Sequence, residues 1–387
     1  MFVYLDNSAT TQPFKEVIEE MTMMMTDSYG NPSSMHKLGV AVEKKIKNAR
    51  RVIERSLGAE EKSVIFTSGG TEANNMAVLG VARRHKKRGG HIITTSIEHP
   101  SILSACQQLE KEGFEVSYLP VDITGVISLE EFKKTLRKET ILVAVMHANN
   151  ETGRLQPIKE IATYLKMQNS RAHFHVDAVQ SFEKISFKVK ALGVDSMTVS
   201  SHKVHGPKGA GALYMKKDVH FEPLVYGGGQ EQDRRPGTEN TLGIIGFSKA
   251  VELIELDKLS HLARLQEIKT NLYEALSKVE DIRVNSDLNK GSVPHILNIS
   301  FKGVRGEVLL HTLEMKDIFV STGSACASNK NKTYSHVLES MGLNNSEKEG
   351  AIRFSFNHML VDDEIDFAAA EIIKSVSELR SIIKGRV

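Results

Sequence analysis

The organisation of this chain can be read outward from the stretch VIFTSGGTE, residues 64–72. Its first four residues are mostly apolar or β-branched and predict a buried strand, while Gly69 and Gly70 predict a tight turn that opens a helix. Free backbone N–H groups at such a turn, together with the positive end of a helix, form a seat for a phosphate group. The stretch lacks the lysine of a P-loop and the spacing of a dinucleotide fingerprint, so it implies no nucleotide.

From about residue 63 to residue 215 the chain alternates short β-branched runs with amphipathic helical patterns, which is typical of a doubly wound, mainly parallel sheet. The predicted strands span residues 64–67, 91–94, 116–119, 141–145, 173–176 and 196–199. The predicted helices between them include residues 101–112, 129–137 and 158–166. Ligands of such sheets bind beyond the carboxyl ends of the strands, so we expect the chemistry at those ends.

A long helical stretch over about residues 241–279, broken near residues 258–260, leads to a region in which the pattern of predicted strands and helices differs from that before it. There we expect strands at 282–284, 296–301 and 351–356, a helix from Gly306 and a closing helix over 362–383. The predicted division is an N-terminal segment, 1–15, that packs with the small domain, a large domain, 16–257, and a small α+β domain, 258–387.

Composition excludes several classes of function. The 387 residues are 40% hydrophobic and 25% charged, as in a globular protein. Lys and Arg number 50 against 48 Asp and Glu, so no overall field favours nucleic acid or a membrane, and we expect neither as a direct partner. Two cysteines, no leader-like pattern in residues 1–11 and no long apolar span predict a cytoplasmic protein. The histidine pairs 173/175 and 202/205 lack a third ligand, so we expect no permanent metal site.

Two more strand ends carry reactive groups. Lys203 follows the predicted strand 196–199, and Asp177 follows the strand 173–176. A lysine desolvated at a strand end can act as an amine nucleophile. A phosphate seat, a lysine and a carboxylate at one edge of a sheet meet the three requirements of pyridoxal phosphate, namely anion binding, a Schiff base and a partner for the pyridinium nitrogen.

At this point the sequence resembles the cysteine desulfurases of the class V aminotransferase family. The matching motifs run in order from YLDNSATT, 4–11, to Arg353, and they are SGGTEANN, 68–75, His99, HANNETG, 147–153, HVDAVQS, 175–181, SSHK, 200–203, and SAC, 324–326. The resemblance covers both predicted domains. It implies a fold-type I transferase dependent on pyridoxal phosphate, with a mainly parallel seven-stranded sheet flanked by helices and a smaller α+β domain.

The resemblance implies a role for each residue around the cofactor ring. Lys203 would hold the cofactor covalently, and Asp177 would bind the ring nitrogen. Gln180 would bind the phenolic oxygen. His99 would stack on the ring and move protons, with deprotonation of the substrate thiol as one candidate role, while Asn150 would lie beside the ring and the substrate.

The resemblance also implies how the phosphate is bound. Residues of the same chain would supply its donors, and they are Gly70, Thr71, Ser200 and His202. Thr238, in the glycine-rich run 227–238, would reach the phosphate of a neighbouring subunit. The active site would therefore require a homodimer.

Cys326 separates a desulfurase from a general aminotransferase, because only a desulfurase needs a thiol there. Small and polar neighbours with nearby lysines favour its thiolate form, and the local sequence resembles that of the group I desulfurases. Cys106 falls on the predicted helix 101–112 and is expected to be buried and inert. Arg353 would bind the substrate carboxylate, and Cys326 is also a candidate for a transient iron–sulfur ligand.

The activity implied by the resemblance converts L-cysteine to L-alanine. Sulfur would pass to Cys326 as a persulfide and then to acceptor proteins for iron–sulfur cluster assembly or tRNA thiolation. Two alternatives stay open: a related class V aminotransferase or selenocysteine lyase, and a catalytically silent scaffold for sulfur transfer. The presence of both Lys203 and Cys326 disfavours the scaffold. The sequence does not identify the acceptor. The chain ends at Val387 and is shorter than family members with an extended C-terminal tail, which argues against docking of the usual iron–sulfur scaffold.

Overall fold

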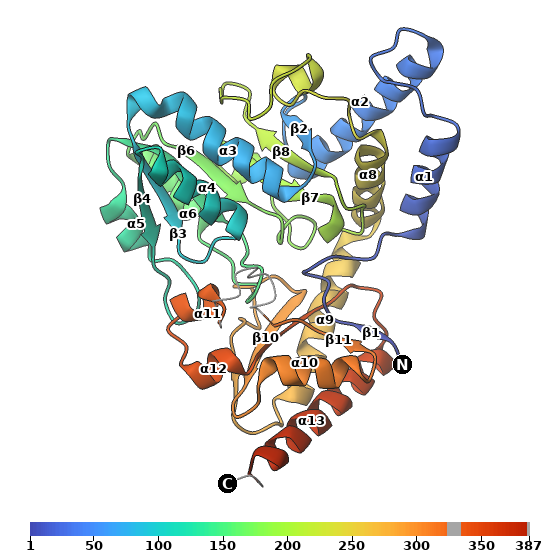
Figure 1. The fold of residues 1–387 in the computed structure, drawn as a ribbon, viewed down its shortest axis with the longest axis vertical. Helices are drawn as coiled ribbons and strands as arrows, with labels where there is room; N and C mark the ends of the chain where they lie inside the picture. Colours follow the sequence, from blue (N-terminus) through green and yellow to red (C-terminus); the bar gives the residue numbers. More distant parts are fainter. Residues whose placement is uncertain (323–333, 385–387) are drawn as a thin grey trace.

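The computed structural model describes residues 1–322 and 334–384. Cys326 therefore lies outside the described residues. Within them, Figure 1 shows a larger αβα part above and a smaller part below, linked by the helices α8 (Thr241–Leu256) and α9 (Lys258–Leu276). These two helices form the long helical stretch that the sequence predicts, and it is interrupted at Asp257, whose φ of −142° and ψ of 39° are not helical.

The larger part is built on a seven-stranded sheet with the order β2-β8-β7-β6-β5-β3-β4. Its strands are β2 (Val64–Thr67), β3 (His91–Thr95), β4 (Glu115–Leu119), β5 (Thr140–Met146), β6 (His173–Asp177), β7 (Ser196–Ser200) and β8 (Gly211–Met215). Strand β8 pairs antiparallel with β2 and β7, and the other pairs are parallel. The mainly parallel seven-stranded sheet is thus confirmed, and β8, which the patterns above did not single out, completes it.

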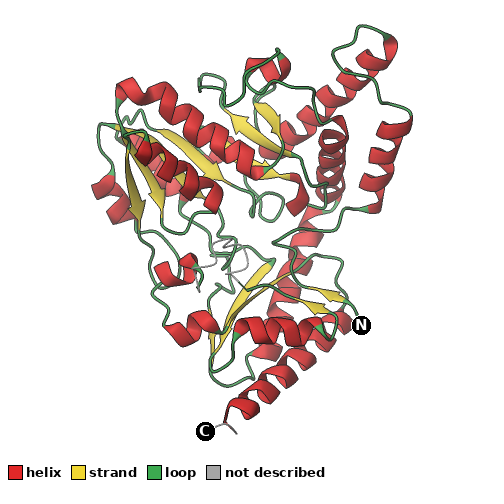
Figure 2. Ribbon diagram, in the orientation of Figure 1, coloured by secondary structure: helices red, strands yellow, loops and turns green. Residues whose placement is uncertain are grey.

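Helices cover both faces of this sheet (Figure 2). One face packs against α3 (Gly70–His85) and α4 (Pro100–Lys111). The other packs against α2 (Lys37–Leu57), α6 (Ile158–Met167) and α8. The central strand β5 is buried along its whole length because alternate residues face the two cores: Leu142 and Ala144 face α3 and α4, and Val143 and Val145 face the other layer. The other α-helices of this part, within the described residues, are α1 (Lys15–Thr26), α5 (Leu129–Thr135) and α7 (Val189–Leu192).

The smaller part has its own core. An antiparallel sheet, β12-β10-β9, is formed by β9 (Ile282–Val284), β10 (Ile296–Phe301) and β12 (Ala351–Ser355). It packs with α9, α10 (Gly306–Glu314) and α13 (Asp362–Lys384), while α11 (His336–Ser340) and α12 (Asn345–Glu349) lie at its edge. Strand β1 (Val3–Tyr4) pairs with β11 (Ile318–Phe319), and Val3 and Leu5 belong to this core. The predicted domain limits at residues 15 and 257 stay predictions.

None of the helices in residues 1–322 and 334–384 combines the length and the apolar composition needed to cross a bilayer.

Candidate active site

The phosphate seat predicted from the sequence is a tight turn between β2 and α3. Gly69 precedes the helix with a φ of 154°, which L side chains rarely adopt. A Cβ on Gly70 would lie 2.9 Å from the Val179 side chain, so glycine is needed here for space. The turn is closed by the Glu72 carboxylate, which accepts a hydrogen bond from the Ser68 N–H at 2.7 Å. The N–H groups of the first turn of α3 are thereby held at the sheet edge.

A cavity of about 250 Å³ lies at this edge, beyond the carboxyl ends of the strands. Most of the predicted site residues line it, and they are Gly70, Thr71, His99, Asn150, Asp177, Gln180, Ser200, His202, Lys203 and Arg353. Thr238 is exposed and is not part of this lining. The structure therefore brings together residues that are far apart in the chain, and it leaves the roles of Thr238 and Cys326 as predictions.

The amine of Lys203 is held at the cavity by the N-terminal segment. Lys203 lies in a short 3-10 turn, η2 (Ser201–Lys203), directly after β7. Its Nζ donates to the carbonyl oxygens of Ser8 and Ala9 at 2.6 and 2.7 Å. Both residues belong to the YLDNSATT motif, but no role for either of them is predicted from the sequence. The nearby Lys208 is exposed and does not line the cavity.

Two donors fix the Asp177 carboxylate. The Asn74 Nδ2 amide donates to Oδ2 at 2.7 Å, and the backbone N–H of Val179 donates to Oδ1 at 3.0 Å. Asn74 also donates to Ser101 Oγ at 2.8 Å. One buried amide thus connects Asp177 to the helix that follows His99. This function of Asn74 is not predicted above. The signal in the sequence that could indicate it is an amide side chain in the second turn of the helix that follows the phosphate seat.

A chain of neutral side chains stands behind Asn74. His175 is fully buried, which lowers its pKa to about 3 and keeps the imidazole uncharged. Its Nε2 lies 3.1 Å from Asn74 Oδ1, and because an amide oxygen only accepts, Nε2 carries the proton. Its Nδ1 then accepts from Ser196 Oγ at 2.8 Å, and His173 Nε2 lies 2.7 Å from the same hydroxyl. Both histidines are therefore used in hydrogen bonds that orient Asn74 toward Asp177.

The tautomer of His99 follows from its position as the N-cap of α4. Its Nδ1 accepts from the Ser101 backbone N–H at 3.1 Å, so the neutral ring carries its proton on Nε2. Burial lowers the pKa of His99, the charge of Asp177 raises it and the charge of Lys203 lowers it. The net lowering favours the neutral ring, which is a donor at Nε2.

Arg353 connects the small sheet to the cavity. It lies on β12, and its side chain is 4% exposed. Its Nη2 donates to Asp6 Oδ1 at 2.7 Å, and its Nη1 donates to the carbonyl oxygen of Asn150 at 2.9 Å. These two bonds leave the guanidinium with further N–H donors in a fixed plane, which suits recognition of a carboxylate.

Buried hydroxyls at the cavity fit an anionic ligand. Ser8 Oγ and Ser200 Oγ are buried, line the cavity and have no hydrogen-bond partner among the described residues. Such groups are costly unless a ligand or water completes their bonds. His202 is also kept neutral, because burial and the charges of Lys203 and Lys208 lower its pKa to about 4. Together with the N–H groups at Gly70, these donors fit a phosphate.

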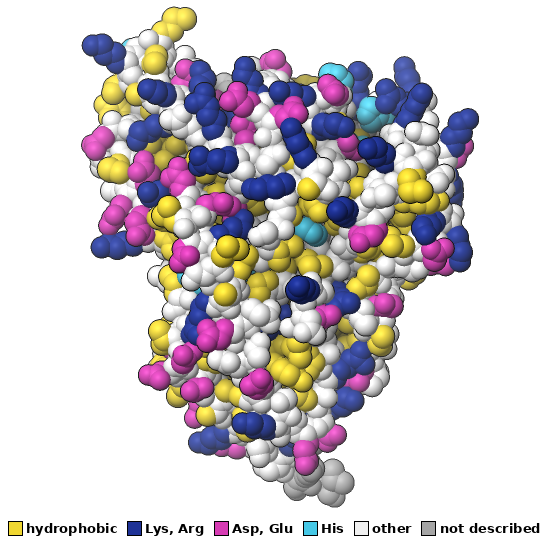
Figure 3. Space-filling model, turned by 180° about the vertical axis from the view of Figure 1, so that it is seen from behind, with side chains coloured by type: hydrophobic (Ala, Val, Ile, Leu, Met, Phe, Trp, Pro, Cys, Tyr) yellow, Lys and Arg dark blue, Asp and Glu magenta, His cyan; other side chains and the backbone are white. Residues whose placement is uncertain are grey.

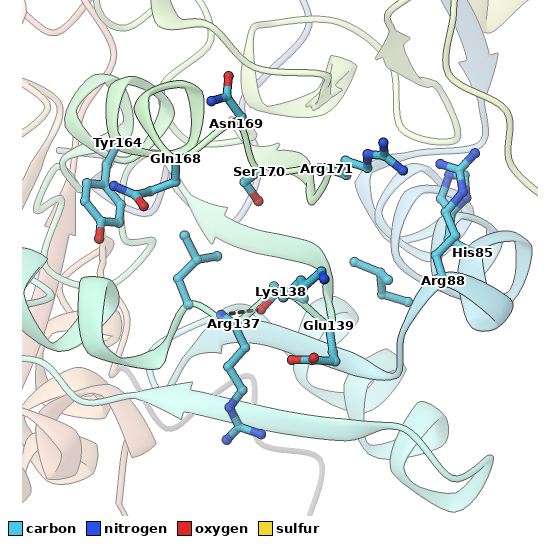
Figure 4. Close-up of a pocket in the computed structure, with 13 residues that line it drawn as sticks. His85, Arg88, Arg137, Lys138, Glu139, Tyr164, Gln168, Asn169, Ser170 and Arg171 are labelled. Atoms are coloured by element: carbon cyan, nitrogen blue, oxygen red, sulfur yellow. Dashed lines mark hydrogen bonds between the residues drawn. The ribbon is translucent and has the colours of Figure 1, made fainter.

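A larger hollow, of about 750 Å³, lies at the opposite edge of the sheet (Figure 4). Its lining is basic and includes Arg88, Arg137, Lys138 and Arg171. Seen from behind, Lys and Arg gather over the upper end of the molecule (Figure 3). This hollow adjoins the amino end of β5 and shares no residue with the predicted site, so it is not the catalytic cavity.

The other cysteine and the histidines considered as metal ligands are explained by burial and hydrogen bonding. Cys106 is fully buried on α4, and burial raises the pKa of its thiol to about 12, which makes it unreactive. His205 Nδ1 lies 2.9 Å from the carbonyl oxygen of Gln12. In the part of the chain that the structure describes, no three His, Cys, Asp or Glu residues are grouped as a metal site requires.

The fold and the arrangement of Lys203, Asp177 and the glycine turn define the class: they are those of the fold-type I enzymes dependent on pyridoxal phosphate. The sequence profile described as aminotransferase class V matches residues 3–367, and the chain belongs to this family. A cysteine desulfurase IscS of Clostridium botulinum, strain Hall, is 43% identical over 98% of this chain and 96% of that protein.

Solved structures agree. A NifS-like protein has a TM-score of 0.92 at 37% identity and covers 97% of this chain and 100% of its own. SspA in complex with cysteine has a TM-score of 0.82 at 34% identity, with 93% and 100% coverage. The predicted resemblance to the cysteine desulfurases is confirmed.

Proposed function

We propose that this chain is a cysteine desulfurase that uses pyridoxal phosphate, converts L-cysteine to L-alanine and passes the sulfur to Cys326 as a persulfide. The observation that carries the proposal is the convergence of Lys203, Asp177 and Arg353 on one cavity. Relatives at 43% identity over nearly the whole chain bear the name of this activity.

The residues of the cavity fit the cofactor. Its phosphate would take the first-turn N–H groups of α3 and the buried hydroxyl of Ser200, which lacks another partner among the described residues. Its ring nitrogen would face the Asp177 carboxylate, and Lys203 would hold it covalently. When bound, pyridoxal phosphate supplies an electron sink that acidifies the Cα–H of an attached amino acid and stabilises the resulting negative charge.

The substrate is positioned by its carboxylate. Arg353 binds the carboxylate with the N–H groups that do not donate to Asp6 or Asn150. The fixed plane of its guanidinium orients the bound amino acid. The Lys203 amine is the base that takes the Cα proton. His99, neutral and protonated on Nε2, donates a hydrogen bond or a proton from that atom, so in this form it stabilises the substrate sulfur rather than deprotonating it.

Sulfur transfer is the task of Cys326. Its thiolate attacks the sulfur of the bound cysteine, an S–S bond forms, and the bond between Cβ and sulfur breaks. The electron pair of the broken bond returns to the carbon skeleton, which takes up protons and leaves as L-alanine. The persulfide then passes to an acceptor protein, for iron–sulfur cluster assembly or tRNA thiolation as the resemblance implies. A reducing, cytoplasmic setting stays the expectation, because it preserves the thiol.

A homodimer is part of the proposal. Large apolar side chains are exposed along residues 18–40, among them Tyr29 at 70% and Met35 at 99%, and Tyr226 is 76% exposed. Exposed apolar surface of this kind marks an interface. Thr238 is exposed and outside the cavity of its own chain. We infer that a second copy covers this surface and that Thr238 completes the phosphate site of the partner.

Product analysis tests the proposed function. The purified protein, loaded with pyridoxal phosphate, is given L-cysteine and a thiol reductant, and the products are separated. We expect one L-alanine for each sulfide released. A keto acid with transfer of the amino group to an acceptor would instead assign the chain to the aminotransferases, and no turnover would assign it to the silent scaffolds.

A further inference from the structure

The start of helix α11 is held by the large sheet region and not only by its own small domain. Ser335 Oγ donates to the Glu151 carboxylate at 2.5 Å, and His336 Nε2 lies 3.0 Å from the carbonyl oxygen of Glu98. Apolar contacts reinforce these bonds, because Val337 and neighbouring residues of α11 share one buried cluster with Ile97 and Met146. We call Ser335 and His336, with their partners Glu151 and Glu98, the α11 anchor.

Both glutamates of the α11 anchor are sequence neighbours of active-site residues and lie in loops that follow strands β3 and β5. Glu98 directly precedes His99, and Glu151 directly follows Asn150. The backbone of Glu151 is fixed independently, because its N–H donates to Asn149 Oδ1 at 2.9 Å and its carbonyl accepts from Asn298 Nδ2 at 3.2 Å. The Glu151 side chain is therefore not needed to hold its own loop, and its carboxylate is directed to Ser335.

Ser335 stands nine positions after Cys326 in the sequence. Before that segment, Ser321 exchanges backbone hydrogen bonds with Arg353 at 3.2 and 2.8 Å. The described residues on either side of the segment are thus both attached near the substrate-binding Arg353: Ser321 through its backbone, and Ser335 through Glu151, whose neighbour Asn150 accepts from the Arg353 guanidinium.

The burial of the Glu151 carboxyl opposes its ionisation. The residue is 3% exposed, and burial raises its pKa to about 7, although the Ser335 hydroxyl and the charge of Arg353 act in the opposite direction. A carboxyl whose pKa is raised on folding makes the folded state less stable at a pH above its unfolded value. A glutamine of the same shape would avoid this cost, so stability does not explain the acid.

We propose that Glu151 is a positioning residue for sulfur transfer: through Ser335 it fixes where the segment that carries Cys326 rejoins the fold, and thereby sets the approach of the thiol to the substrate. The proposal rests on the proposed function, since it assigns a task within that reaction. Glu151 is not among the residues that line the cavity, so it acts through Ser335 and not on the substrate or the cofactor. It acts on the transfer step and leaves cysteine binding to Arg353.

The test compares Glu151→Gln with the wild type, both loaded with cofactor. Cysteine binding is followed by the change in cofactor absorbance, and the rate of persulfide formation on Cys326 is followed by mass spectrometry of rapidly quenched samples. We expect unchanged cysteine affinity and a melting temperature not below that of the wild type. Persulfide formation should be slower by on the order of 10-fold, because the amide oxygen of glutamine accepts the Ser335 hydrogen bond more weakly than a carboxylate does.

The pH dependence gives a readout that a merely structural role would not move. Below the Glu151 pKa of about 7 the wild type resembles the glutamine variant, and above it the carboxylate is formed. The ratio of the wild-type rate to the Glu151→Gln rate should therefore rise with pH through about 7, while groups that titrate in both proteins, such as His99, cancel in the ratio. Arg353 is the charged group that acts on Glu151 among the described residues, and it stays charged throughout.

Matched variants complete the experiment. Ser335→Ala should slow persulfide formation in the same way, Ser335→Thr should restore it, and Glu151→Gln should add nothing to Ser335→Ala. Glu54→Gln is the control for a buried carboxyl outside the α11 anchor. Glu54 lies on α2 and accepts a hydrogen bond from the Ser63 N–H at 3.1 Å, and its substitution should leave the rate of persulfide formation unchanged. Equal rates in wild type and Glu151→Gln would overturn this proposal alone. A wild type that forms no persulfide would overturn the proposed function and this inference with it.

Discussion

Replacing Arg353 with lysine keeps the positive charge and removes the planar fork. In the structure two N–H groups of Arg353 are already bound to Asp6 and Asn150, and the side chain is only 4% exposed. A lysine has three donors on one nitrogen and cannot keep both partners and bind a carboxylate with two parallel bonds. The loss is one hydrogen bond between charged groups, about 1.5–3 kcal/mol, or roughly 10- to 150-fold in kcat/KM.

The assay is steady-state alanine production over a range of cysteine concentrations. Because the carboxylate is bound equally in the ground state and in the transition state, the loss should fall mainly on KM and leave kcat nearly unchanged. Arg83→Lys is the matched control. Arg83, on α3, forms a two-pronged ion pair with Glu112 outside the cavity, so this substitution should change neither kcat nor KM. An unchanged KM in Arg353→Lys would refute the assignment of Arg353 to the substrate carboxylate.

Three further predictions follow from the same site. Lys203→Ala should abolish covalent binding of the cofactor, measured by borohydride reduction and peptide mass, whereas Lys208→Ala should retain it because Lys208 is exposed and outside the cavity. Cofactor still bound covalently in Lys203→Ala would contradict the assignment. Cys106 should resist alkylation in the native protein at neutral pH, because burial raises its pKa to about 12, and Cys106→Ser should keep full activity; equal losses in Cys106→Ser and Cys326→Ser would show that the acceptor thiol is misassigned. Mixing Lys203→Ala with Thr238→Ala subunits should restore activity, since a heterodimer has one site free of both changes, and no recovery despite verified exchange would exclude the cross-subunit role.

The fold was predictable where local pattern decides it. Strands β2 and β9, among others, fall where β-branched runs lie between turn residues, and α8 and α9 follow the long apolar periodicity. Strand β8 reads Gly-Ala-Leu-Tyr-Met, with no alternation and no β-branched residue, so its local pattern does not predict a strand. Its place between β2 and β7 is set by pairing with strands elsewhere in the chain, which a local pattern does not contain.

In the candidate site, the residues at strand ends were predictable from the sequence, and their hydrogen-bond partners were not. Lys203 and Asp177 stand at strand ends and could be placed by topology alone. Asn74 could not, because its function arises from a hydrogen bond to Asp177 across 103 positions of sequence, and amides are common on helices. Ser8 was missed for a similar reason: it contacts Lys203 through its backbone carbonyl, and no side-chain pattern reports a carbonyl.

Whether Cys326 receives the sulfur is decided by the masses of the peptides that contain Cys326 and Cys106 after a single turnover with L-cysteine. The chain, loaded with pyridoxal phosphate and freed of reductant, is mixed with one equivalent of cysteine, quenched and digested, and alanine is counted in the same sample. We expect that the peptide containing Cys326 gains one sulfur atom for each alanine formed, and that Cys326→Ser gains none while it still binds cysteine. Alanine without sulfur on Cys326, or sulfur on the peptide containing Cys106, would contradict it.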